Sequence, residues 1–393
     1  MTESLVEKIA DAVLYEGYIL YPYRPSAVKN QQRWNFGALC PESYSVAQRG
    51  TESWTMQTEC LIQANLKTSL SVKVRFLHLL MREVAVPNSS FRSGISDSRF
   101  PIPDGAEYQV VPSLEVNGRL QQTWQEAVER EVVVPSVKLN DSENGSRRVS
   151  SIGSRRVSFS FPGSESSEDL RDAGSGELLG VIIRKQQALA GAIEVRVTDC
   201  GFSGEIQNLE IQKAEIQNAD QSNLDTAKAD RLLKVTIQIL NETPLENAPE
   251  RSRDDALMRS FVSTHTILNA DGGEFVSLLD PPEAFREAAA ACSNLGTYPV
   301  LVGEEGARDC MLSSPIILYD YPQIAPESPG SLFDGTEIDE ILTLRIMTLT
   351  DEEKREMRGA DERARQILER TELLPAEQLM KMHGAMKGVN RKS

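Results

Sequence analysis

The sequence predicts an α+β protein that is mainly β, with an antiparallel, sandwich-like region first and a mixed hairpin and helix region, ending in helices, after it. Through the first 250 residues, apolar and polar residues alternate in several stretches, which is the period-two pattern of half-buried strands. Turn-forming Pro, Gly and Asn residues separate these stretches, as in sandwiches and open barrels. Further on, the pattern becomes helical, and Thr350 with Glu353 forms a capping box.

The first predicted element is an amphipathic helix over residues 4–14. Leu5, Ile9 and Val13 recur there at helical spacing. A short helix is also expected at 123–130. The strands expected in the β-rich region lie at residues 15–23, 33–39, 54–64, 70–84, 108–116, 132–139, 180–185, 192–198 and 232–240.

A segment at about 140–176 interrupts the strand pattern. It is rich in Ser, Gly, Arg and Glu, and the hexapeptide GSRRVS occurs in it twice. This composition predicts a disordered Ser/Arg loop. Because Arg-Arg-x-Ser is similar to a basophilic kinase site, Ser150 and Ser158 are candidate phosphorylation sites. The alternative is a duplicated low-complexity loop with no role.

A second irregular segment spans about 201–230. Glu-Ile-Gln recurs in it every five residues, a period that suits neither a helix nor a strand, so we interpret it as an expanded hairpin insertion. The polar connector at 241–255 then marks a boundary. The predicted domains are a β-rich sandwich-like domain at 1–250, with its N-terminal helix, and a C-terminal α+β region at 251–393 with terminal helices.

In the C-terminal region, a hairpin is expected across 257–279, because Ala270–Gly273 is a strong turn signal. A helix opening at Asp280 is expected to continue to Cys292. The remaining expected elements are a strand at 298–302, a helix at 350–370, a last helix from 375 to about 386, and a basic tail.

Composition limits the class of protein. The formal charge of -16 and the pI of about 4.9 disfavour direct binding to nucleic acid or to anionic lipid. Five scattered cysteines without a CxxC motif disfavour a disulfide framework or a zinc finger. No secretory signal and no run of about 18 apolar residues is present. We therefore expect a cytoplasmic protein without membrane insertion and without a cofactor.

Two surfaces are candidates for binding a protein partner. The first is an aromatic and cationic block near the N-terminus; the second is the proline-rich loop that follows the apolar run at 316–319. Tyr, Trp and Arg dominate interface hot spots. The alternatives are a half-buried face of a sheet for the block and a packed Ω-loop for the loop. The candidate residues are Tyr18, Tyr21, Tyr23, Arg24 and Trp34 in the block, and Asp320, Tyr321, Phe333 and Asp334 in the loop.

A metal or catalytic site is the competing prediction. His265, Cys292 and Cys310 lie in the C-terminal region with several carboxylates, and such side chains bind nickel, iron or zinc. No pair of them has the spacing of a known ligand motif. Ser313 or Ser314 with His265 suggests a hydrolase, but no GxSxG elbow is present. No phosphate-binding or dinucleotide fingerprint occurs either.

Two blocks of the sequence carry a family resemblance. The first, Asp11–Leu39, is DAVLYEGYILYPYRPSAVKNQQRWNFGAL. The second begins at Ser263 and includes STHTILNADGGEFVSLLDPPEA and SSPIILYDYPQIAPESPGSLFDGTEIDEILTLRIMTLTDEEKREM. They resemble uncharacterised bacterial proteins that are associated with gene clusters of high-affinity uptake nickel-iron hydrogenases.

This resemblance implies a non-catalytic accessory or assembly protein for the hydrogenase. Its partner would be a hydrogenase subunit or a fellow accessory protein, and it carries over no catalytic residue. Two alternatives stay open: a metal-handling protein or hydrolase that uses the His265, acid and Cys cluster, and a scaffold of an oligomeric complex.

Overall fold

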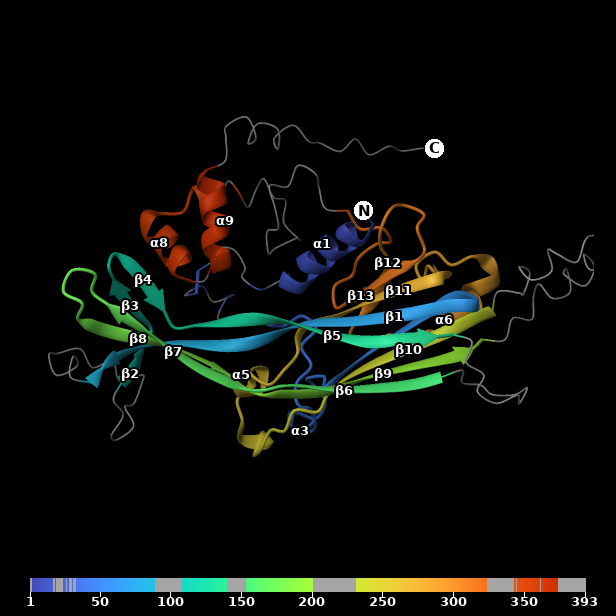
Figure 1. Ribbon diagram of the computed structural model, residues 1–393, viewed down its shortest axis with the longest axis horizontal. Helices are drawn as coiled ribbons and strands as arrows, with labels where there is room; N and C mark the ends of the chain where they lie inside the picture. The colour runs from blue at the N-terminus through green and yellow to red at the C-terminus, as the bar shows by residue number, and fades with distance from the viewer. Residues whose placement is uncertain are drawn as a thin grey trace, which may run out of the picture.

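The structure is a computed structural model of the 393-residue chain. Its described part is dominated by one large antiparallel sheet, with helices packed mainly on one side (Figure 1). The described residues are 2–16, 18, 24–25, 27, 30, 33–88, 108–139, 153–200, 231–323, 343, 345–360 and 362–373.

Within these residues, eleven strands form the sheet in the order β12-β13-β11-β1-β10-β9-β6, and β2, β5, β7 and β8 join off this path. A separate two-stranded sheet pairs β3 (Ser113–Val116) with β4 (Arg119–Gln122). The strands of the large sheet are β1 (Thr55–Pro87), β2 (Tyr108–Val111), β5 (Trp124–Lys138), β6 (Gly153–Phe161), β7 (Ser164–Arg171), β8 (Leu178–Gln186), β9 (Leu189–Asp199), β10 (Arg231–Asn241), β11 (Val262–Val276), β12 (Tyr298–Leu301) and β13 (Cys310–Ser314).

Short helices connect and cover the strands. None of the described helices is both long and apolar enough to cross a membrane. The helices are α1 (Thr2–Tyr15), α3 (Glu42–Ala47), η3 (Ala248–Glu250), α5 (Arg253–Leu257), η4 (Glu283–Phe285), α6 (Arg286–Ala290), α8 (Asp351–Ala360) and α9 (Glu362–Glu372).

Strand β1 is the long central strand of the sheet. Along its 33 residues it pairs in turn with β10, β11, β5, β8 and β2, and every pairing is antiparallel. A register shift against β11 lies between Ala64 and Ser69. The sequence dictates this long strand because apolar residues alternate on both sides of the shift, and such residues share one face of a strand.

That face of β1 lines the main core of the curled sheet. The core joins residues of β1, β5, β9, β10, β11, β12 and β13. The fully buried ring of Phe76 contacts three other phenylalanines, with centroid separations of 6.0 Å to Phe159, 6.0 Å to Phe161 and 4.6 Å to Phe261. These aromatic contacts tie β6 to β1 although the two strands do not pair.

Three groups of helices pack on the opposite face of the sheet and bury it. Helix α1 packs on residues of β11, β12 and β13. Helices α8 and α9 pack on Leu77, Leu79 and Trp124, together with Tyr15 at the end of α1. The η4 and α6 segment covers Leu61. Figure 1 shows α1, α8 and α9 along the same side of the sheet.

The prediction of a mainly β, antiparallel protein is confirmed. Eleven of the described strands belong to one curled sheet, and a sandwich of two large stacked sheets is not seen in the described ranges. The strand pairing also joins the two predicted regions, because β11 of the C-terminal region pairs with β1 over Leu61–Leu77.

Three predictions about the first 250 residues were wrong. Residues 33–39 form no strand, and only Leu39 is bridged there, to Phe261. Residues 153–171 are not disordered: they form β6 and β7. Their Ser- and Arg-rich composition conceals an alternation in which Val157, Phe159 and Phe161 pack against the core. The helix expected at 123–130 is instead the start of β5, because pairing with β1 overrides the helix propensity of its Glu and Ala residues. Residues 140–152 and 201–230 lie outside the described residues.

Two predictions about the C-terminal region were also wrong. No hairpin forms at Ala270–Gly273; β11 continues through it, and Gly272, with a φ of 71°, lies opposite the register shift of β1. The expected helix at 280–292 shortens to η4 and α6. The capping box of α8 is confirmed: the Glu353 amide donates to the Thr350 hydroxyl, and the Thr350 amide donates to the Glu353 carboxylate.

Replacing Gly191 with Ala is expected to destabilise the protein by about 2 kcal/mol, because an added Cβ overpacks the sheet. It would lie 2.6 Å from the Leu240 carbonyl oxygen and 2.6 Å from the Phe261 ring. Urea unfolding measures this loss. Gly174→Ala is the matched control, since its nearest neighbour would be 3.5 Å away. Equal stability of the two variants would contradict the tight approach of β9 to β10 and Phe261.

Candidate functional site

The segment after β13 is held to the sheet at two consecutive residues. The Asp320 carboxylate accepts hydrogen bonds from the Ser277 hydroxyl (2.6 Å) and the Leu301 amide (2.8 Å). The Tyr321 amide donates to the Leu301 carbonyl (2.7 Å), and its hydroxyl donates to the Ala307 carbonyl (2.9 Å). Tyr321 has a φ of 55°, and such backbone strain occurs where surroundings hold a segment firmly, often at ligand clamps.

Just before this anchor, the chain presents two large apolar side chains to solvent. Ile317 is 72% exposed and Tyr319 is 84% exposed. Their neighbours Ile316 and Leu318 pack against the cluster beneath α1. The alternation makes Ile317 and Tyr319 an outward-facing pair on a fixed backbone, which we call the presented pair.

A cavity of about 510 Å³ lies beside the anchor, between α1 and the loop after β12. Its lining includes two largely apolar side chains and three carboxylates. The predicted candidates Asp320 and Tyr321 both line it, whereas Phe333 and Asp334 lie outside the described residues. The lining residues are Leu5, Glu304, Glu305, Asp320, Tyr321 and Gln323.

The predicted aromatic block near the N-terminus is largely internal. Tyr18 and Trp34 are 3% and 4% exposed. Their partner is the buried Arg33, whose guanidinium lies 4.3 Å from the Trp34 ring centroid and 3.6 Å from that of Trp124. Arg33 also donates to the Tyr18 carbonyl at 2.8 Å. This burial argues against direct partner contact through Tyr18 and Trp34.

The other candidates in the block have different positions. Arg24 is partly exposed and forms an ion pair with Glu353 of α8 at 3.2 Å. It therefore helps to join the N-terminal segment to the C-terminal helices. Tyr21 and Tyr23 lie outside the described residues.

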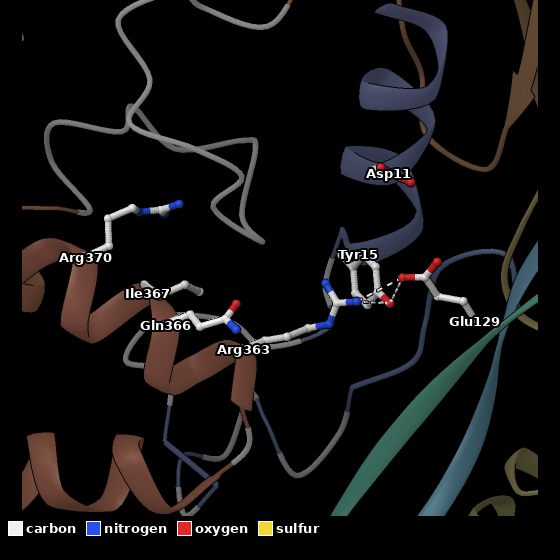
Figure 2. Close-up of a pocket in the computed structure, with 7 residues that line it drawn as sticks. All are labelled: Asp11, Tyr15, Glu129, Arg363, Gln366, Ile367 and Arg370. Atoms are coloured by element: carbon white, nitrogen blue, oxygen red, sulfur yellow. Dashed lines mark hydrogen bonds and ion pairs between the residues drawn. The ribbon is translucent and has the colours of Figure 1, made fainter. Parts of the chain in front are cut away.

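A second cavity, of about 360 Å³, lies where α1, β5 and α9 meet (Figure 2). Figure 2 shows Tyr15, Glu129 and Arg363 converging at its edge. The Tyr15 hydroxyl donates to Glu129, and Arg363 pairs with Glu129 at 2.9 Å. The Arg363 guanidinium also stacks 3.4 Å from the Tyr15 ring centroid. The sequence offered no signal for this cluster, since its members come from three distant elements.

Ionic contacts continue from this cavity to β1. The Arg75 side chain is only 8% exposed, and it pairs with Asp11 at 2.7 Å and with Glu7 and Glu129 at 3.3 Å each. Burial opposes ionisation of Glu129, but the bond from Tyr15 and the charges of the two arginines outweigh it, so its pKa is lowered. Burial also raises the pKa of Tyr15, which stays a neutral donor. Each of the named carboxylates and guanidinium groups has at least one oppositely charged partner, as expected for a cluster that fastens α1 and α9 to the sheet.

The structure does not bring the predicted metal ligands together. His265 is buried in β11, and its ring bonds to the Ser263 carbonyl at 3.0 Å. Cys310 packs in the cluster beneath α1, whereas Cys292 packs beside α6. Throughout the described ranges, no group of three or more His, Cys, Asp or Glu side chains is placed to hold a metal ion.

The hydrolase arrangement also fails to assemble in the described part of the chain. The buried Ser313 hydroxyl bonds to the hydroxyls of Thr58 and Thr297, at 2.7 Å each, and not to His265. The Ser314 hydroxyl donates to the Ile316 carbonyl at 2.8 Å. Both serines therefore stabilise β13 and the segment after it, and neither hydroxyl is bonded to a base among the described residues.

The two candidate modification sites differ in position. Ser158 lies on β6 and is exposed, with Ala192 of β9 as its partner in the pairing. A kinase would therefore have to act on a residue in a regular strand. Ser150 lies outside the described residues, and phosphorylation of either serine stays a prediction.

Comparison with known proteins adds no further assignment. No protein-family model matches the chain, and no curated protein matches it.

Proposed function

We propose that this chain is a non-catalytic accessory or assembly protein for an uptake nickel-iron hydrogenase, acting in the cytoplasm by recognising a hydrogenase subunit or a fellow accessory protein. The observation that carries the recognition role is the presented pair, Ile317 and Tyr319, at 72% and 84% exposure on an anchored segment. Exposed aromatic side chains on a fixed backbone make effective interface anchors, because little conformational freedom is lost on binding.

Two further considerations support the same surface. The segment lies inside the second sequence block that resembles the hydrogenase-associated proteins, and that resemblance alone supplies the identity of the partner. The adjoining cavity adds carboxylates and apolar area, a mixture that is typical of the rim and core of a partner-binding surface.

The test is the double variant Ile317→Ser with Tyr319→Ala in the native cell. We expect capture of the hydrogenase partner by the tagged full chain to fall about 30-fold, because truncating a central hot spot costs about 2 kcal/mol. Quantitative mass spectrometry of the co-purified hydrogenase subunits measures capture, and hydrogen uptake should fall in parallel.

Val46→Ser is the matched control. Val46 is 68% exposed on α3, which lies outside the segment after β13, and its replacement should leave capture unchanged. Unchanged capture by the double variant, with the chain still folded, would refute recognition through the presented pair. Loss of capture with Val46→Ser alone would move the partner surface to the α3 region.

A further inference from the structure

Helices α8 and α9 are fastened to each other by an acidic residue at the end of α9. The Glu372 carboxylate pairs with Arg358 at 2.6 Å and with Lys354 at 3.5 Å, and both of these residues belong to α8. Each helix also contributes buried side chains to the same apolar cluster. We therefore expect the two helices to move together.

The α8 side of this pair is packed closely on the strands beneath it. An added Cβ at Gly359 would lie 2.5 Å from the Leu120 carbonyl oxygen, so the backbone of α8 lies directly on β4. The buried Arg82 of β1 donates a hydrogen bond to the Ala360 carbonyl at 3.0 Å. Because close-packed backbones resist separation, the α8 side is the firmly held edge of the pair.

The α9 side, in contrast, meets α1 across the cavity of about 360 Å³ (Figure 2). Arg363 spans the edge of this cavity: it pairs with Glu129 of β5 at 2.9 Å and stacks 3.4 Å from the Tyr15 ring centroid. The Glu129 side chain is 43% exposed, and ion pairs that solvent reaches contribute little stability. A cavity also removes packing contacts between the elements that line it. The α9 side is therefore the weaker edge.

The two helices bury few large apolar side chains. Helix α8, of 10 residues, buries Met357 and Ala360. Helix α9, of 11 residues, buries Ala364, Ile367 and Leu368 as its apolar side chains. Two of these five are alanines, which bury little area. Elements with few buried apolar contacts open at a lower free energy than core strands do, so we expect this pair to open before the sheet unfolds.

We propose that α8 and α9 form a hinged cover, which opens along α9 while the sheet stays folded. The contact of α8 with β4 is the hinge, and the pair of Arg363 with Glu129 is the contact that closes the cover. Opening widens the cavity between α9 and α1 and exposes the apolar cluster beneath the helices. Tyr18 and Trp34 belong to that cluster, so the access of solvent to the N-terminal aromatic block depends on the cover.

Thiol labelling of the purified full chain with N-ethylmaleimide, without denaturant, tests the cover. Leu368→Cys on α9 and Met357→Cys on α8 each place a thiol where the native side chain is 0% exposed. The native Cys60 of β1, also 0% exposed, reports unfolding of the sheet. Mass spectrometry of the peptides gives each rate. We expect Leu368→Cys to react at least about tenfold faster than Cys60 and faster than Met357→Cys. If Leu368→Cys fails to fold, Ala364→Cys takes its place, at another α9 position that is 0% exposed.

Glu129→Gln removes the closing charge and keeps the shape of the side chain. It should raise the labelling rate of Leu368→Cys about fivefold, the factor for one partly exposed ion pair, and about 0.5 M salt should act in the same direction. Glu131→Gln is the matched control: Glu131 lies on the same strand, is 45% exposed and pairs with Lys73 at 3.5 Å, so its replacement should leave the rate unchanged.

Three results would each overturn the proposal. They are a Leu368→Cys rate as low as that of Cys60, equal rates in the two helices, and a rate that does not respond to Glu129→Gln. No partner is present in this experiment. Its failure therefore leaves the proposed recognition role standing, and failure of partner capture leaves the cover standing.

Discussion

Replacing Phe76 with Ala is expected to lower the free energy of unfolding by about 4 kcal/mol, the range for removing a fully buried aromatic ring. The Phe76 side chain is 0% exposed and contacts the rings of Phe159, Phe161 and Phe261. Its loss leaves a cavity between β1 and β6, which no hydrogen-bonded pairing of these two strands compensates. Urea unfolding followed by far-UV circular dichroism measures the change.

Two comparison variants make this expectation specific. Phe159→Ala should cost about 2 kcal/mol, because this ring is only partly buried against the core. Phe36→Ala, at a ring that is 44% exposed, should cost under about 0.5 kcal/mol. If Phe159→Ala were as mild as Phe36→Ala, the packing of β6 on the core would be contradicted.

Lowering the pH from about 6.5 to 4 is expected to destabilise the protein through two buried histidines. Burial lowers the pKa of both His78 and His265 to about 4. In the unfolded chain they titrate near 6.5. Below that pH the unfolded state binds more protons than the folded state, so stability falls as pH falls. By pH 4 each histidine accounts for a loss of about 3 kcal/mol.

The local contacts explain why neither ring accepts a second proton readily. The Nε2 atom of His78 bonds to the Gln187 carbonyl at 2.8 Å, and the Arg130 guanidinium donates to its Nδ1 at 3.4 Å. A second proton would therefore face a cation. In His265, Nδ1 bonds to the Ser263 carbonyl, and the buried Nε2 has no hydrogen-bond partner among the described residues.

Urea midpoints at pH 7, 6, 5 and 4.5 measure this dependence. His265→Gln should flatten the curve between pH 6.5 and 4, because the variant loses one titrating group. His383→Gln is the control: His383 is the third histidine of the chain, outside the described residues, and its removal should leave the curve unchanged. A curve unaffected by His265→Gln would show that His265 titrates alike in both states.

Local patterns in the sequence were enough to predict much of the sheet. Strands β8, β9, β10 and β12 fall where the period-two pattern and the turn residues place them. Prediction failed where the composition of a segment indicated disorder or helix, but pairing with distant strands made the segment a strand. Residues 153–161 look disordered from their Ser and Arg content, and they are ordered because three apolar side chains reach a core formed by distant strands.

The candidate site was predictable only in part. The Asp-Tyr-Pro turn at 320–322 predicts the start of the loop, and Asp320 and Tyr321 lie where this loop is anchored to the sheet. The exposure of Tyr319 depends on which residues pack beneath α1, which no local pattern reveals. The burial of Trp34 was missed for the same reason, since Arg33 and Trp124 stack across 91 positions in the sequence.

The pairing of β1 with strands that are distant in the sequence has a consequence for the synthesis of this protein. Residues 55–64 of β1 pair with β10, which a ribosome produces about 170 residues later, and residues 61–77 pair with β11, which follows later still. At 5–20 residues per second, residues 55–64 of β1 lack their pairing partners for on the order of ten seconds or more. The nascent chain therefore displays an unpaired apolar strand segment early, and binding by chaperones during synthesis should matter more for yield than the stability of the finished fold.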